Sequence, residues 1–103
     1  MILSTDNSLV QDIEFAKKSG FTADFMYINK KIIDRKTKKE YTDRDCFLVE
    51  FCRHEGMNDP SDSSILFLIE CIDNIKGCLS SAYGKDADPN LIEFVINLNK
   101  KEE

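Results

Sequence analysis

The chain has 103 residues, of which 42% are hydrophobic, and a formal net charge of −5. This length predicts one domain, residues 1–103, that can bury a core without disulfides. The acidic balance argues against nucleic acid as a partner, because phosphate binding requires clustered cations. There is no signal-peptide pattern, and no apolar run approaches the ~18 residues of a membrane span. We therefore expect a cytoplasmic protein with no membrane partner.

Four cysteines stand at positions 46, 52, 71 and 78, and no two of them form a C-x-x-C pair. The spacing therefore favours neither a zinc ribbon nor a thioredoxin-type site. In the cytoplasm thiols are kept reduced, and a free cysteine in a core behaves as a small apolar residue. We expect four buried, unpaired cysteines.

The first predicted element is a helix over about residues 6–19. Thr5 or Asp6 can cap its start, and Gly20 suits the position just after its end. Its buried stripe is predicted to consist of Leu9, Val10, Ile13 and Ala16.

Four short stretches rich in β-branched and aromatic residues predict strands at 23–29, 47–54, 65–72 and 76–83. Residues 31–34 either continue the first strand or pair with it. Residues 35–45 are expected to form a loop with a short helical turn at 42–45. Asp73-Asn74 is expected to form a tight turn. Short links between strands imply antiparallel pairing.

Two of these strands have informative faces. Strand 65–72 is apolar on both faces, so we expect both to be covered, by the other helix or by a second copy of the chain. In strand 47–54, alternation puts Phe47, Val49 and Phe51 on one face and Leu48, Glu50, Cys52 and His54 on the other. Glu50 and Glu70 either mark a solvent-exposed face, which we favour, or lie in a dimer interface, where each requires a partner such as Lys76.

A second helix is predicted after Asp88, which can cap it, with Pro89 at its first position. Leu91, Phe94, Val95 and Leu98 form its predicted buried stripe. The order of the elements predicts an α+β fold, in which an antiparallel sheet of about four strands is flanked by an N-terminal and a C-terminal helix.

Five motifs in the chain have recognisable spacing: Lys18-Ser19-Gly20-Phe21-Thr22-Ala23-Asp24-Phe25, Arg53-x-Glu55-Gly56-x-x-Asp59-Pro60-x-Asp62, Ser64-Ile65-Leu66, Lys76-Gly77 and Ala82-Tyr83-Gly84. Together they resemble a family of short bacterial proteins common in the Bacteroidetes. The resemblance covers most of the chain. It departs from the family at His54, where members usually carry an aromatic residue, and at Ser81, where they usually carry Asp.

This resemblance implies little about activity. Members are sometimes labelled phosphoribosylpyrophosphate synthetases, but the residues do not support that label. The chain is much shorter than those enzymes and lacks their acidic-apolar phosphoribosyl-binding stretch. It also contains no phosphate-binding loop of the Walker type.

The two recognisable motifs at 53–63 and 83–84 are predicted to meet at one end of the sheet. Pairing by turn centres puts His54 opposite about Ser64, and Ile65 opposite about Tyr83. One interpretation is a turn closed by its own polar side chains, with Gly56 and Pro60 setting the backbone. The other is a site for a small polar ligand. Its candidate ligand-binding residues are Arg53, Glu55, Asp59, Asp62 and Tyr83.

Other chemistries find less support in the spacing. Carboxylates in the 55–62 loop suit Ca²⁺ or Mg²⁺, but they fit no EF-hand, so we predict no metal site and no cofactor. His54 and Cys52 lie ~6.6 Å apart along one strand face, which suits catalysis poorly, so no catalytic residue is predicted. Residues 30–40 carry six Lys or Arg against two acids; they form either a lysine-guarded sheet edge or an anion-binding patch.

The sequence thus favours a non-enzymatic binding or interaction module that self-associates as a homodimer through a sheet face. The alternative is a small enzyme or metabolite-binding protein with its site at the 53–63/83–84 end of the sheet. The sequence identifies neither the ligand nor the partner.

Overall fold

A computed structural model of the chain describes residues 1–55, 63–84 and 86–101. The elements are α1 (Leu9–Lys18), β1 (Ala23–Ile28), β2 (Lys31–Asp34), β3 (Glu40–Tyr41), the 3-10 turn η1 (Asp43–Asp45), β4 (Cys46–His54), β5 (Ser64–Cys71), β6 (Lys76–Ala82), α2 (Pro89–Ile96) and β7 (Asn99–Lys100). Both predicted helices, the four main strands and the short turn near 42–45 are confirmed, whereas β3 and β7 were not predicted. Neither helix is long and apolar enough to cross a membrane.

The predicted four-stranded antiparallel sheet is wrong. In the part of the chain that the structure describes, the strands form one seven-stranded mixed sheet in the order β3-β2-β1-β6-β5-β4-β7. The β1–β2, β2–β3, β4–β5 and β5–β6 pairs are antiparallel, but β1 runs parallel to β6, and β4 runs parallel to β7. Pairing each strand with its sequence neighbour gave the wrong sheet, because β1 joins a strand some 50 residues later in the chain.

Gly77 makes the junction of β1 and β6 possible. It lies opposite Ala23 in the parallel pair. A Cβ atom added at Gly77 would come within 2.4 Å of the Ala23 carbonyl oxygen and 2.7 Å of the Ala23 Cβ. Only glycine permits this approach of the two backbones.

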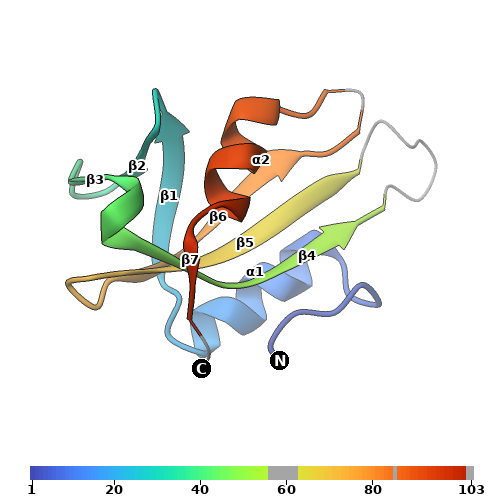
Figure 1. The fold of residues 1–103 in the computed structure, drawn as a ribbon. Coiled ribbons are helices and arrows are strands. Elements are labelled where there is room, and N and C mark those ends of the chain that lie inside the picture. The colour runs from blue at the N-terminus through green and yellow to red at the C-terminus, as the bar shows by residue number, and fades with distance from the viewer. Residues whose placement is uncertain (56–62, 85, 102–103) are drawn as a thin grey trace.

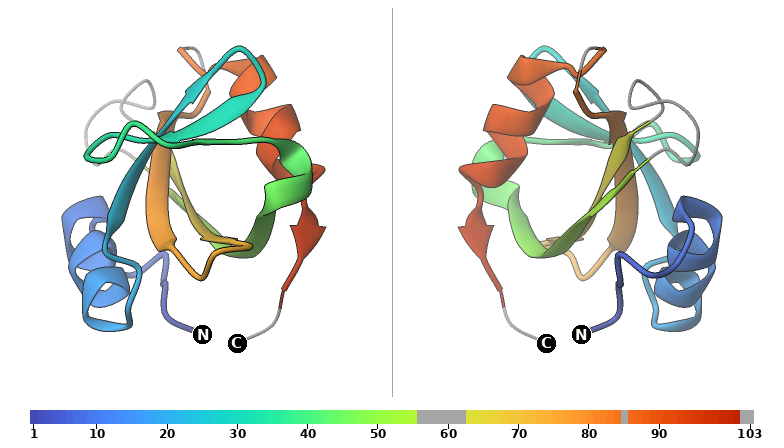
Figure 2. Two further views of the ribbon diagram at one scale, coloured as in Figure 1. Left: turned by 90° about the vertical axis from the view of Figure 1, so that its left-hand side faces the viewer. Right: turned by 90° about the vertical axis from the view of Figure 1, so that its right-hand side faces the viewer.

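The sheet curls into a half-barrel, with α2 lying across its open side and α1 packed against its outer face (Figures 1 and 2). Alternate residues of β5 supply the two cores. Ile65, Phe67, Ile69 and Cys71 face the inner core with α2, whereas Leu66 and Leu68 face the outer core with α1. The prediction that both faces of this strand are covered is confirmed, and the cover comes from the two helices of one chain.

A β-bulge in β4 changes the predicted faces of that strand. The register with β5 shifts between Leu48 and Glu50. Leu48 therefore lies in the inner core, Val49 packs against the outer core, and Phe51 returns to the inner side, where its ring contacts Phe67. The prediction that Val49 and Phe51 share a face is wrong, because the extra residue breaks the period-two alternation.

The start of α1 also differs from its prediction. Ser8, rather than Thr5 or Asp6, caps the helix and forms a capping box with Gln11. Val10 is 65% exposed, and Asp12 is one of the buried residues of the helix. Gly20 follows the helix with φ +101°, as its C′ position requires. Asp88 caps α2 and Pro89 opens it, as predicted.

The two glutamates inside the strands, Glu50 and Glu70, are held by specific partners. Glu70 is 4% exposed and lies 2.6 Å from Lys101 and 3.8 Å from Lys76, so the favoured prediction of a wet face is wrong for this residue. Glu50 instead accepts hydrogen bonds from the backbone N–H groups of Ile2 and Leu3. All four cysteines are free and buried, as predicted.

Candidate functional site

Four residues gather where β4 and β6 end and β5 begins, and we call them the hairpin-end cluster: Arg53, Glu55, Ser63 and Tyr83. The Arg53 guanidinium lies 4.6 Å from the centre of the Tyr83 ring and donates to Glu55 at 3.0 Å. The Ser63 hydroxyl donates to Glu55, and the Tyr83 N–H donates to the Ser63 carbonyl. The structure thus brings together three of the predicted ligand-binding residues, Arg53, Glu55 and Tyr83. The other two, Asp59 and Asp62, lie outside the described residues.

The register explains this convergence. His54 lies opposite Ser64, as predicted, and Ile65 lies opposite Ser81, two residues from Tyr83 and within the one- or two-residue slip that pairing by turn centres allows. The hydrogen bond with Arg53 holds the pKa of the Glu55 carboxyl below its usual value, and Ser63 adds to the effect. The same contact raises the pKa of Arg53. Because these groups are exposed and already paired, the cluster presents an ordered polar surface and not a group poised for proton transfer.

A groove of about 800 Å³ runs along β4 beside this cluster. One wall is the N-terminal segment, residues 1–5, and the other is β4 from Glu50 to Arg53, with Glu55 at its end. On this side β7 pairs with β4 only at Phe47 and Leu48, and among the described residues no other strand pairs there. The N-terminal segment does not extend the sheet, because the N–H groups of residues 2–4 bond to the side chains of Glu50 and Asp12. The edge of β4 beyond Leu48 is therefore open to the groove.

Phe51 gives this open edge an apolar contact point. Its side chain is 50% exposed, although one side of the ring packs on Phe67 at a centroid distance of 6.1 Å. An exposed aromatic residue beside an unpaired strand edge is unusual, since proteins generally protect such edges with charge or cover. The combination marks this edge as a contact surface.

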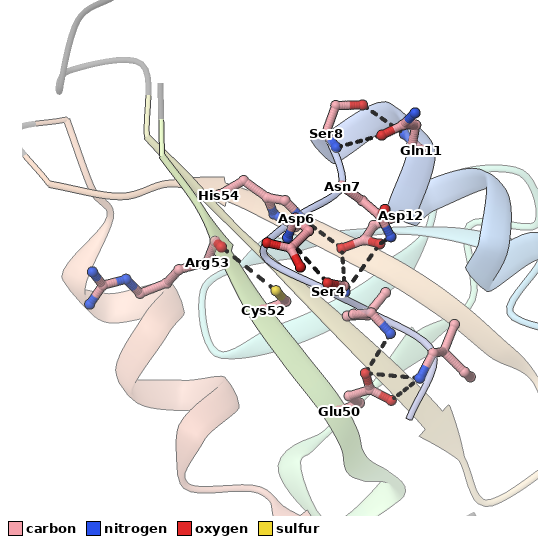
Figure 3. A network of polar contacts seen from close by, with 12 residues as sticks. Ser4, Asp6, Asn7, Ser8, Gln11, Asp12, Glu50, Cys52, Arg53 and His54 are labelled. Atoms are coloured by element: carbon pink, nitrogen blue, oxygen red, sulfur yellow. Dashed lines mark hydrogen bonds and ion pairs between the residues drawn. The ribbon is translucent and has the colours of Figure 1, made fainter. Parts of the chain in front are cut away.

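A second group of polar side chains lies on the outer side of β4, and we call it the His54 cluster: Asp12, Cys52 and His54 (Figure 3). The His54 Nε2 atom lies 2.6 Å from the Asp12 Oδ2 atom, and the two side chains are 6% and 0% exposed. The Asp12 carboxylate also accepts hydrogen bonds from the backbone N–H of Ser4 and the amide of Asn7. Asp12 was not predicted as a partner of His54, although its position among Leu9, Ile13 and Ala16 placed it on the buried stripe of α1.

Cysteine–histidine catalysis gains no support from this geometry. Burial raises the pKa of the Cys52 thiol, and the nearby Asp12 carboxylate raises it further. Cys52 is therefore held as a thiol, and its Sγ atom lies 3.6 Å from the Arg53 carbonyl, which it faces as a weak donor. The thiolate required of a nucleophile is disfavoured here.

The basic segment at 30–40 forms the β2–β3 edge of the sheet. Lys31 pairs with Glu40 at 2.8 Å, Arg35 with Asp24 at 3.5 Å, and Lys39 with Asp73 at 2.7 Å. These contacts correspond to the lysine-guarded edge that was one of the two interpretations of this segment. Anion binding by the segment stays a prediction.

Comparisons with known proteins returned no match to a family model, to a curated protein or to a solved structure. The resemblance to the short Bacteroidetes family therefore stays a prediction from its motifs.

Proposed function

We propose that the chain is a non-enzymatic interaction module that binds an extended peptide segment of a partner protein along the open edge of β4. The observation that carries the proposal is that β4 beyond Leu48 has no strand partner on this side among the described residues and lies in a groove. Strand addition uses the unpaired backbone N–H and C=O groups for affinity and alternate side chains for selectivity.

The walls of the groove suggest what the peptide carries. A strand added beside β4 directs alternate side chains to its two sides. Those on the outer side meet the half-buried Ile2 and the wall of residues 1–5, and those on the inner side meet Phe51. Apolar side chains at alternate positions suit both surfaces. At the end of the groove, Arg53, with Glu55 and Tyr83 beside it, offers a polar anchor for the peptide.

The shape of the groove also favours a single extended peptide over a second copy of the chain. Each copy carries residues 1–5 beside its own β4, so two copies meeting edge to edge would bring two such walls together. Both faces of β5 are already covered within one chain, so this strand needs no second copy. Self-association is therefore an outcome of the test and not the proposal.

The test uses short random peptides displayed as a library and selected on the full chain, followed by amide chemical-shift mapping with a selected peptide. We expect peptides with alternating apolar residues, with shifts concentrated in residues 49–55 and 1–5. Phe51→Lys should abolish binding, since it places a charge in the apolar contact. Phe15→Lys is the matched control, because Phe15 is 45% exposed on α1 and lies away from the groove.

Three results would contradict the proposal. The first is that no peptide is selected, and the second is that Phe51→Lys binds as well as Phe15→Lys. The third is a concentration-dependent dimer in sedimentation that Phe51→Lys disperses, which would assign the edge to a second copy. Shifts confined to Arg53, Glu55 and Tyr83 would instead favour the small-ligand site expected from the sequence.

A further inference from the structure

We propose that the His54 cluster is a binding site for a divalent transition-metal ion, with zinc as its representative. The proposal is independent of peptide binding at the β4 edge. The site would be formed by α1, which supplies Asp12, and by β4, which supplies Cys52 and His54.

The geometry requires only small side-chain movements. One oxygen of Asp12, the Cys52 sulfur and one ring nitrogen of His54 all lie within 4.8 Å of one another. Zinc holds such atoms at about 2.0–2.3 Å, which places them roughly 3.3–3.8 Å apart in a tetrahedral site. The 2.6 Å distance between Asp12 and His54 must therefore lengthen by about 1 Å, and the distances to the sulfur, which are at most 4.8 Å, must shorten by up to about 1.5 Å.

The donor set selects the kind of ion. A thiolate, a carboxylate and an imidazole form a mixed S, O, N set, which suits zinc and its neighbours. Calcium and magnesium prefer oxygen ligands, which the cluster supplies from Asp12 alone. On binding, the S–H bond of Cys52 and the Nε2–H bond of His54 break, and S–metal and N–metal bonds form. The thiol proton passes to solvent, and the ring stays neutral with its proton on Nδ1. The anionic sulfur and carboxylate then balance the two positive charges of the ion.

A purely structural account of the cluster leaves one atom unexplained. The His54 Nδ1 atom is buried and has no hydrogen-bond partner among the described residues. An unsatisfied buried polar atom costs about 1–3 kcal/mol, so the hydrogen bond to Asp12 does not by itself account for a histidine at this position. Metal ligation through Nε2, the nitrogen beside Asp12, would leave Nδ1 as the N–H of the ring, the group that metal-bound histidines hydrogen-bond to an outer acceptor or to water.

The surroundings provide support and access. The N–H of Ser4 and the amide of Asn7 also donate hydrogen bonds to the Asp12 carboxylate, as outer hydrogen bonds orient metal ligands elsewhere. A cavity of about 500 Å³ adjoins His54 and is lined by residues 5–9, Glu55 and Ser64. It offers an entry path for the ion and room for a water molecule as the fourth ligand.

The test titrates the reduced full chain with cobalt(II), whose spectrum reports four-coordination and thiolate ligation. We expect uptake of one equivalent, a thiolate-to-cobalt charge-transfer band, and loss of both when zinc is added. Cys52→Ser should remove the band and weaken uptake by at least about tenfold. Cys78→Ser is the matched control, because Cys78 is equally buried in the same outer core but lies outside the cluster. It should keep the wild-type spectrum.

A measurement on the wild-type chain removes any dependence on how the variants fold. X-ray absorption of the zinc-loaded protein should show one sulfur and several nitrogen or oxygen neighbours. The proposal is overturned by a first shell without sulfur, by the absence of stoichiometric cobalt uptake, or by equal loss of the band in Cys52→Ser and Cys78→Ser. Any of these would leave Asp12 and His54 as a hydrogen-bonded pair that ties α1 to β4.

Discussion

Asp73, in the turn between β5 and β6, joins segments that are far apart in the sequence. Its carboxylate accepts hydrogen bonds from Lys39 at 2.7 Å and from the Tyr41 hydroxyl at 2.9 Å. It also accepts a hydrogen bond from the backbone N–H of Ile75, which closes its own turn. The contact with Lys39 holds the pKa of Asp73 below its ordinary value of 3.8, and Tyr41 adds to the effect. The carboxylate thus fastens the β2–β3 edge to the β5–β6 turn in its ionised form.

Asp73→Asn should therefore destabilise the chain in a pH-dependent way. Because the folded-state pKa is lowered, the stabilisation is present above pH 3.8 and is lost as the pH falls through the folded-state value. Exposed pairs of this kind contribute about 0.2–1 kcal/mol, so we expect a loss of that size at neutral pH. Urea unfolding at a series of pH values measures it. The difference in the free energy of unfolding between Asp73→Asn and wild type should shrink in acid. The control is Asp86→Asn, at an exposed aspartate before α2, which should leave the free energy of unfolding nearly unchanged at every pH. A loss that stays constant with pH would show that the charge of Asp73 plays no part.

The contacts between residues of the candidate sites could be predicted from the sequence in one case and not in the other. Arg53, Glu55 and Tyr83 could be placed together, because hairpin pairing by turn centres needs only local information. Asp12 and His54 could not be paired, since their contact depends on how α1 lies on the sheet. The sequence does contain one indication of this contact. Asp12 interrupts the apolar stripe of α1, and a carboxylate buried there requires a hydrogen-bond partner.

At the scale of the elements, the local patterns predicted the helices and main strands well, and the departures have separate physical causes. β3 and β7 are only two residues long each, too short for a periodic pattern. The bulge at Val49 cannot be read from the sequence, because one extra residue in a strand carries no characteristic residue type here. The parallel junction of β1 with β6 depends on contacts distant in sequence, and Gly77 was its one local indication.

Gly77→Ala should therefore weaken the junction between the two halves of the sheet. The new Cβ meets backbone atoms of Ala23, which cannot move aside as a flexible side chain can. We expect a loss of about 1–3 kcal/mol in the free energy of unfolding, with faster amide exchange in β1 and β6. Ser80→Ala, at an exposed position of the same strand, should stay within about 0.5 kcal/mol of wild type. Equal stability of the two variants would mean that β1 does not need this close approach.

At the scale of the whole molecule, one sheet supports two separate cores. The inner core lies between the sheet and α2, and the outer core lies between the sheet, α1 and the N-terminal segment. β5 contributes to both through the two faces of the same strand, which mechanically links them. This arrangement follows from the apolar run at 65–72, but which helix covers which face is decided by the curl of the sheet, and that curl is a property of all seven strands (Figure 2).

Because the two cores share β5, we expect them to unfold together. Leu98→Ala removes a buried side chain of the inner core, and Leu3→Ala removes one from the outer core; the two leucines are 3% and 4% exposed. Each should cost about 2–5 kcal/mol. Urea unfolding followed by far-UV circular dichroism and by tyrosine fluorescence should give coincident single transitions for both variants. Val10→Ala, at a 65% exposed position of α1, is the control and should leave the midpoint nearly unchanged. If Leu3→Ala instead gives two separate transitions, the N-terminal segment and α1 form a unit that unfolds on its own. The wall of the β4 groove formed by residues 1–5 is then less stable than β4 itself.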